Sequence, residues 1–101
     1  LKFPFYLNKL MFVLASYDIV DNRRRSKVAN TLKNYGKRVQ YSVFECILER
    51  DKIKKMIEAV NKLIDKQEDS IRIYQLCDTC SRKIQVYGIG KITEDKEMFI
   101  V

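Results

Sequence analysis

The sequence predicts an α+β fold in which two helices cover one face of an antiparallel sheet. Two segments, 22–35 and 52–66, place apolar residues at the three- and four-residue spacing of amphipathic helices. Runs rich in apolar, β-branched and aromatic residues lie before, between and after them, at 11–19, 38–49 and 71–76. Hydrophobic residues make up 47% of the 101 residues and charged residues 33%, which is typical of a globular domain.

The first strand and helix are predicted from 11–19 and 22–35. The strand segment is apolar almost without interruption, as in a central strand buried on both faces. Asp21 or Asn22 can cap the helix, and Gly36 is expected to end it as a left-handed stop. Its apolar stripe is Val28, Ala29, Leu32 and Tyr35.

The second half of the fold begins with 38–49, which is too long for one average strand. We expect two strands with a tight reversal near Ser42 and Val43, with a single bent strand as the alternative. Asp51 is expected to cap the second helix, whose apolar stripe is Ile53, Met56, Ile57, Val60, Leu63 and Ile64. A strand at 71–76 and a short strand at 84–87 follow. The order βαββαβ with an extra C-terminal strand is the ferredoxin-like sandwich.

We divide the chain into a leader (1–10), a ferredoxin-like nucleic-acid-binding domain (11–90) and a C-terminal tail (91–101). The leader starts with Leu, and Met11 is a plausible native start, so the leader is treated as an upstream extension or as non-native residues. The tail ends in Met-Phe-Ile-Val, and we expect it to pair with a sheet edge of a partner protomer.

The charge of +7 is concentrated at the start of the chain. Residues 1–40 contain nine Lys or Arg and two Asp, whereas residues 41–101 contain eleven of each sign. This asymmetry favours a polyanion such as nucleic acid as partner. The absence of histidine excludes His-based catalysis and imidazole zinc sites, so a nuclease would depend on carboxylates and a hard metal ion.

Asp18 lies near the end of the first strand, just before three arginines at the predicted helix start. An acid beside such a cationic helix start suggests a divalent metal next to a phosphate-binding surface. The alternative is a strand-end acid that caps a turn or pairs with Arg25. The cations Arg23, Arg24, Arg25 and Lys27 oppose the helix dipole, which favours a role in ligand binding.

Three cysteines, an odd number, argue against a secreted disulfide framework. Cys77 and Cys80 have metal-ligand and redox spacing, but a four-ligand zinc site would need a second subunit. We interpret them as structural turn cysteines, with zinc or a disulfide as alternatives. No apolar run is long enough to span a membrane, and we expect a cytoplasmic protein.

Four segments together identify a family. They are Met-Phe-Val-Leu-Ala-Ser-Tyr-Asp-Ile, Asp-Asn-Arg-Arg-Arg-Ser-Lys-Val, Gly-Lys-Arg-Val-Gln-Tyr-Ser-Val-Phe-Glu-Cys and Asp-Ser-Ile-Arg-Ile-Tyr-Gln-Leu-Cys. In order and spacing, residues 11–90 closely resemble the CRISPR-associated (Cas) number-two protein family, the small subunit of the spacer-acquisition machinery. The resemblance implies a homodimer that binds double-stranded DNA between copies of its integrase partner. It also implies metal-dependent endonuclease activity, on single-stranded RNA in some members and double-stranded DNA in others.

The resemblance also implies site residues. The family's strand-end acid falls on Asp18, the expected catalytic residue and metal ligand. Since one carboxylate cannot hold Mg²⁺ or Mn²⁺ tightly, we expect the symmetry-related Asp18 to share the ion. The family's basic positions fall on Arg25, Lys27 and Arg38, which we expect to contact phosphates; Lys27 keeps the charge of the usual arginine but loses its bidentate geometry.

The family's turn aromatic falls on Phe44. Tyr17 and Phe44 are expected to flank the metal or stack on a base, with core packing as the alternative for Phe44. The sequence therefore predicts a CRISPR adaptation protein with a metal-dependent endonuclease site. The alternatives are a non-catalytic DNA-binding scaffold for the integrase and a basic RNA-binding module unrelated to CRISPR.

Overall fold

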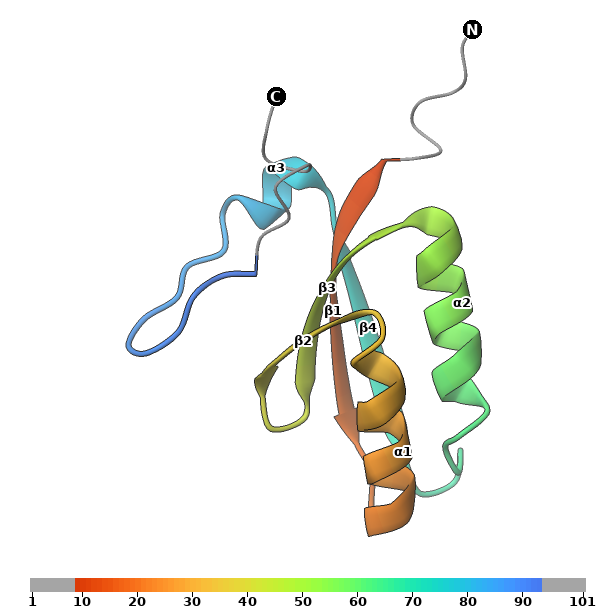
Figure 1. Cartoon of the computed structure of the whole chain (residues 1–101). Coiled ribbons are helices and arrows are strands. Elements are labelled where there is room, and N and C mark those ends of the chain that lie inside the picture. The colour runs from red at the N-terminus through yellow and green to blue at the C-terminus, as the bar shows by residue number, and fades with distance from the viewer. Residues whose placement is uncertain (1–8, 94–101) are drawn as a thin grey trace, which may run out of the picture.

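The computed structural model describes residues 9–93, which form a four-stranded sheet with two long helices on one face (Figure 1). The strands are β1 (Leu10–Asp18), β2 (Gly36–Gln40), β3 (Val43–Glu49) and β4 (Ser70–Leu76), and the helices are α1 (Asn22–Leu32), α2 (Arg50–Asn61) and the short α3 (Asp78–Ser81). The strand order is β2-β3-β1-β4, and every neighbouring pair is antiparallel. This arrangement confirms the predicted α+β fold with its βαββαβ core.

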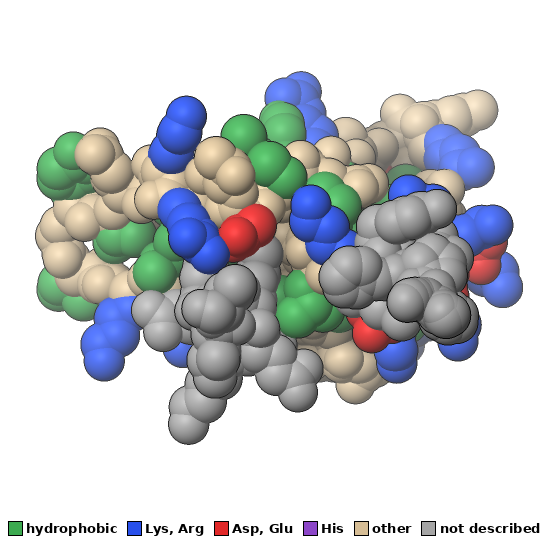
Figure 2. Space-filling view, turned by 90° about the horizontal axis from the view of Figure 1, so that it is seen from above, with side chains coloured by type: hydrophobic (Ala, Val, Ile, Leu, Met, Phe, Trp, Pro, Cys, Tyr) green, Lys and Arg blue, Asp and Glu red, His purple; other side chains and the backbone are tan. Residues whose placement is uncertain are grey.

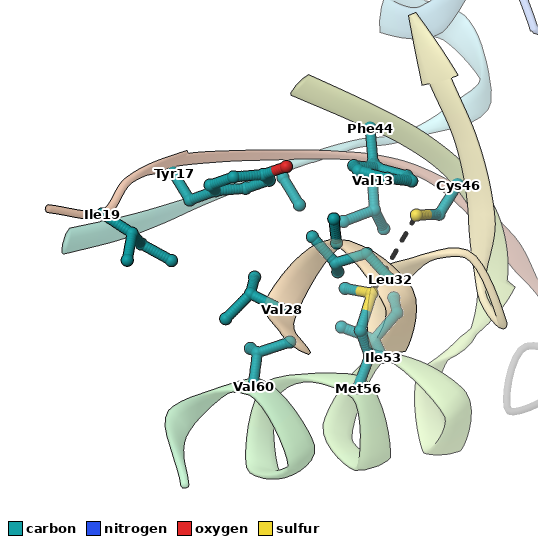
Figure 3. Close-up of a cluster of buried hydrophobic side chains, with 12 residues drawn as sticks. Val13, Tyr17, Ile19, Val28, Leu32, Phe44, Cys46, Ile53, Met56 and Val60 are labelled. Carbon is teal, nitrogen blue, oxygen red and sulfur yellow. Dashed lines mark hydrogen bonds between the residues drawn. The ribbon is translucent and has the colours of Figure 1, made fainter. Parts of the chain in front are cut away.

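The core lies between the sheet and the two long helices, as Figure 3 shows. Alternate residues of β1 and β3 point into it, because successive side chains of a strand face opposite sides. The buried residues of the helices belong to the predicted apolar stripes. The cluster comprises Val13, Ala15, Tyr17, Ile19, Val28, Ala29, Leu32, Phe44, Cys46, Ile53, Met56 and Val60. On the other face of β1, Phe12 is also fully buried, as expected for a central strand.

The reversal between β2 and β3 falls at Tyr41 and Ser42, as predicted. The short strand predicted at 84–87 is wrong, because these residues form no strand. A strand needs a neighbouring edge for its backbone hydrogen bonds, and no strand of residues 9–93 pairs with this segment. The predicted C-terminal strand and most of the leader lie outside the described residues.

Two predicted helix boundaries are wrong for identifiable reasons. Gly36 has no positive φ and does not end α1; it starts β2, where a Cβ would clash with Cys46 Sγ and the Glu45 carbonyl oxygen. Asp51 lies in the first turn of α2, whose N-cap is Glu49. Asp21 does cap α1, since its carboxylate accepts a hydrogen bond from the Arg24 backbone N–H at 2.9 Å.

Candidate nucleic-acid and metal site

Asp18 is the last residue of β1, whose C-terminal end lies at the end of the sheet where α1 begins (Figure 1). The Asp18 side chain is exposed. It lines a hollow of about 300 Å³ together with Tyr17, Arg25 and Tyr41; we call it the Asp18 hollow. Within residues 9–93, the Asp18 carboxylate makes no hydrogen bond or ion pair. The carboxylate is therefore available to an external ligand rather than used to pair Arg25.

Arg25 holds the loop that follows Asp18. Its Nε and Nη2 atoms donate to the Ile19 carbonyl oxygen at 3.1 and 2.9 Å, and Nη2 also donates to the Val20 carbonyl oxygen at 3.2 Å. Its Nη1 atom donates to the Asn22 side-chain oxygen. Several of its donors thus satisfy backbone carbonyls, while its positive charge stays fixed on the wall of the Asp18 hollow.

Arg24 forms a bridge that the sequence did not suggest. Its Nε atom donates to Asp69 Oδ2 at 2.7 Å, and its Nη2 atom lies 3.2 Å from Glu68 Oε1. The Asp69 side chain is fully buried and also accepts hydrogen bonds from the backbone N–H groups of Val20, at 3.2 Å, and Asp65, at 2.9 Å. The bridge ties the loop after Asp18 to the segment that leads into β4.

These contacts change the titration of Asp69. The Arg24 hydrogen bond, assisted by the N–H groups of Asp65 and Val20, lowers the pKa of Asp69 from 3.8 to about 2, against the opposing effect of burial. The same pairing raises the pKa of Arg24. Arg24 therefore has a structural reason to lie at a helix N-terminus, so its position there is no sign of a phosphate contact.

Tyr17, Phe44 and Arg38 form a layered contact. Phe44 is 0% and Tyr17 4% exposed, with ring centroids 6.4 Å apart, and both rings lie in the core (Figure 3). The Arg38 guanidinium lies 5.4 Å from the Phe44 ring centroid, and its Nη2 atom donates to the Tyr17 hydroxyl at 3.4 Å. Within one chain, neither ring presents a free face on which a base could stack.

The remaining predicted cations differ in their surroundings. Lys27 and Arg23 are exposed on α1 and point away from the core, whereas Arg38 is held against Phe44. At the opposite end of the molecule, the visible basic side chains are spread over the face, from its centre to its rim (Figure 2). Cations also line other hollows, for example Arg50 and Lys54 beside α2. The Asp18 hollow differs from these in holding a carboxylate without a partner among residues 9–93 next to Arg25.

No group of three or more Asp, Glu or Cys residues that could hold a metal ion occurs in the described part of the chain. Asp18 supplies one carboxylate to a divalent cation, which is half of the protein ligand set expected from two Asp18 residues. Cys77 and Cys80 are exposed and free. Cys77 precedes α3, and hydrogen bonds from Cys80 lower the pKa of its thiol. Cys80 lies within α3, so the segment predicted as a turn is a short helix, and the structural role of the two cysteines stays a prediction.

Comparison with known proteins now identifies the chain. A family model described as CRISPR associated protein Cas2 matches residues 11–84. The chain belongs to the Cas2 family. This confirms the resemblance inferred from the four sequence segments. None of the helices among residues 9–93 is long and apolar enough to cross a membrane.

Relatives and solved structures agree with this assignment. The CRISPR-associated endoribonuclease Cas2 3 of Chloroflexus aurantiacus is 45% identical, covering 90% of this chain and 98% of the relative. The CRISPR-associated endonuclease Cas2 2 of Thermus thermophilus is 37% identical, covering 94% and 100%. The crystal structure of Streptococcus pyogenes Cas2 has a TM-score of 0.68 and 34% identity, covering 77% of this chain and 100% of that one. A chain of the partial Cas6-RT-Cas1–Cas2 complex has a TM-score of 0.65 and 26% identity, with coverages of 76% and 90%.

Proposed function

We propose that this chain is a homodimeric, metal-dependent endonuclease of CRISPR adaptation, acting on single-stranded RNA or double-stranded DNA at a site formed by Asp18 and its symmetry mate. One observation carries the proposal. The Asp18 carboxylate is exposed, has no partner within residues 9–93, and shares a hollow with the positive charge of Arg25. An unpaired carboxylate can hold a divalent metal ion, and the fixed charge of Arg25 beside it can attract the phosphate that this ion would contact.

Mg²⁺ or Mn²⁺ is the cofactor that these residues fit. Both ions prefer oxygen ligands and keep several waters, so one carboxylate from each protomer would suffice. When bound, the ion would supply an activated water and offset charge on the scissile phosphate. Lys27 and Arg38 are proposed to contact neighbouring phosphates, and Arg25 to fix the loop that carries Asp18. Burial favours a supporting role for Tyr17 and Phe44 over base stacking.

Exposed apolar side chains support the homodimer. Val86, Tyr87 and Ile89 are 46%, 83% and 104% exposed along a segment that has no strand partner within residues 9–93. On β4, Tyr74 is 49% exposed. A second copy that offered a sheet edge would bury these side chains and give the segment the hydrogen bonds of a strand. The C-terminal tail is proposed to continue this pairing.

Family membership supports the biological setting. Relatives are named CRISPR-associated endoribonuclease and endonuclease, and a structural neighbour belongs to a complex with Cas1. We therefore propose a CRISPR integrase subunit as the protein partner and the cytoplasm as the location. RNA and DNA are both candidate substrates, because both carry the phosphodiester backbone that the proposed contacts would bind, whereas contacts to the 2′-hydroxyl would distinguish them.

A non-catalytic scaffold that holds duplex DNA for the integrase is the second candidate. It is favoured by the single carboxylate that each chain contributes to the site. The test is Asp18→Ala, assayed separately for Mg²⁺-dependent cleavage and for spacer acquisition in cells. The nuclease proposal expects cleavage to be lost. Cleavage at the wild-type rate would contradict it, and acquisition that persists without cleavage would show that adaptation uses the scaffold alone.

A further inference from the structure

A second hollow, of about 350 Å³, lies between α1 and the β2–β3 end of the sheet; we call it the α1 hollow. Asn22, Ser26, Asn30 and Lys33 line it at the spacing of one helix face. The sheet side contributes Arg38 and Tyr41. None of these positions except Arg38 was a predicted contact.

The charge of the α1 hollow is one-sided. Arg25, Lys33 and Arg38 line it, and no Asp or Glu does. The two guanidinium groups are held in place, Arg25 by the Ile19 and Val20 carbonyls and Arg38 by the Phe44 ring. Three cations around one hollow repel each other unless an anion lies between them. Amide and hydroxyl groups from Asn30 and Ser26 offer an anion hydrogen bonds as well.

The α1 hollow adjoins the Asp18 hollow, because Tyr17, Arg25 and Tyr41 line both. A nucleic-acid strand with one phosphate beside Asp18 would therefore lead its next phosphates along α1. We propose that the α1 hollow binds a phosphate of a single nucleic-acid strand that extends from the Asp18 hollow, with Lys33 and Asn30 as contacts. The path of the nucleic-acid strand from Asp18 to the α1 hollow rests on the proposed function, whereas the binding of a phosphate in the α1 hollow does not.

A phosphodiester in a strand fits this hollow better than a free anion. The hollow is open, two of its contacts (Lys33 and Asn30) are exposed, and it continues past Arg25 into the Asp18 hollow. Sites for free anions usually surround the ligand with many donors, whereas a strand needs a track with successive cations.

The test is a set of short single-stranded oligonucleotides, each with one neutral methylphosphonate linkage at a different position, bound to the full-length protein without metal. We expect neutralisation at one linkage, or two adjacent ones, to weaken wild-type binding about 1.5- to fivefold, the range of one exposed ion pair. Lys33→Gln should weaken binding of the unmodified strand by a similar factor and reduce the sensitivity at that linkage, since Arg25 and Arg38 remain. For Lys33→Gln, the slope of log affinity against log salt concentration should be shallower than that of wild type by about 0.7.

Lys55→Gln is the matched control, because Lys55 is exposed on α2 and lines neither hollow. Asn30→Asp is a second variant that adds a carboxylate to the hollow and should weaken binding without removing a cation. Equal losses for Lys33→Gln and Lys55→Gln would overturn the proposal, as would a linkage profile that Lys33→Gln leaves unchanged. Inorganic phosphate that binds the hollow without displacing the oligonucleotide would also overturn it. Asp18→Asn should leave the linkage profile intact, so a failure of the nuclease proposal would be seen separately in cleavage.

Discussion

Asp69 and Arg24 join the two loops beside Asp18, although 45 positions separate them in the chain. The pattern of single residues could not predict this pair, because nothing near Asp69 distinguishes it from Asp65 or Glu68. Asp18, in contrast, stood out as an acid at the end of an apolar strand, and the structure does expose it there. Strand-end position is local information, whereas ion pairing across the fold is not.

Asp69 provides a prediction about pH. Because folding lowers its pKa from 3.8 to about 2, the ionised carboxylate stabilises the fold fully above about pH 4, and this contribution is lost as the pH falls toward 2. Asp69→Asn should therefore unfold more easily than wild type at neutral pH, and the difference should shrink between pH 4 and 2. Urea unfolding across this range checks it. A deficit that stays constant down to pH 2 would contradict the assignment.

Phe44 provides a prediction about its role. It is 0% exposed, so Phe44→Ala should lower the free energy of unfolding by about 3–5 kcal/mol, as expected for a buried aromatic residue. Tyr41→Ala is the control, since Tyr41 is 78% exposed and its loss should change stability by less than about 0.5 kcal/mol. Chemical denaturation measures both. Similar small losses in the two variants would contradict the packing of Phe44 in the core.

At the scale of elements, hydrophobic periodicity predicted the helix faces that pack in the core. The stripe that includes Ile53, Met56 and Val60 correctly located α2, because burial of one helix face requires this spacing. Helix ends were less predictable. Gly36 suggested a left-handed stop, but its lack of a side chain serves the close approach of β2 to β3. The segment at 84–87 has strand composition but forms no strand, because no strand among residues 9–93 lies beside it to accept its backbone hydrogen bonds.

Gly36→Ala tests the explanation for this glycine. An added Cβ would meet Cys46 Sγ and the Glu45 backbone, so β2 must move away from β3. We expect a loss of about 1–3 kcal/mol of stability, the usual cost of overpacking. Lys37→Ala, one residue further along β2, should cost much less because Lys37 is exposed. Equal stabilities of the two variants by thermal or urea unfolding would show that β2 adapts without strain.

At the scale of the whole molecule, the exposed apolar side chains Val86, Tyr87 and Ile89 are where the dimer can be tested. Replacing Tyr87 and Ile89 with Ser removes the most exposed apolar side chains of the 84–92 segment. If this segment pairs with a second copy, the double variant should dissociate at concentrations where wild type sediments as two chains. Sedimentation velocity over a concentration series measures this. Wild-type protein that remains a single chain would contradict the homodimer.

A site completed only by two chains makes a sharp prediction about mixed dimers. We propose measuring Mg²⁺-dependent cleavage by a purified heterodimer of one wild-type and one Asp18→Asn chain, each with a different affinity tag. If both Asp18 carboxylates hold one ion, the heterodimer should be nearly as inactive as the Asp18→Asn homodimer while still binding oligonucleotide. Half of the wild-type rate would contradict the shared site, because it would mean that each Asp18 acts alone.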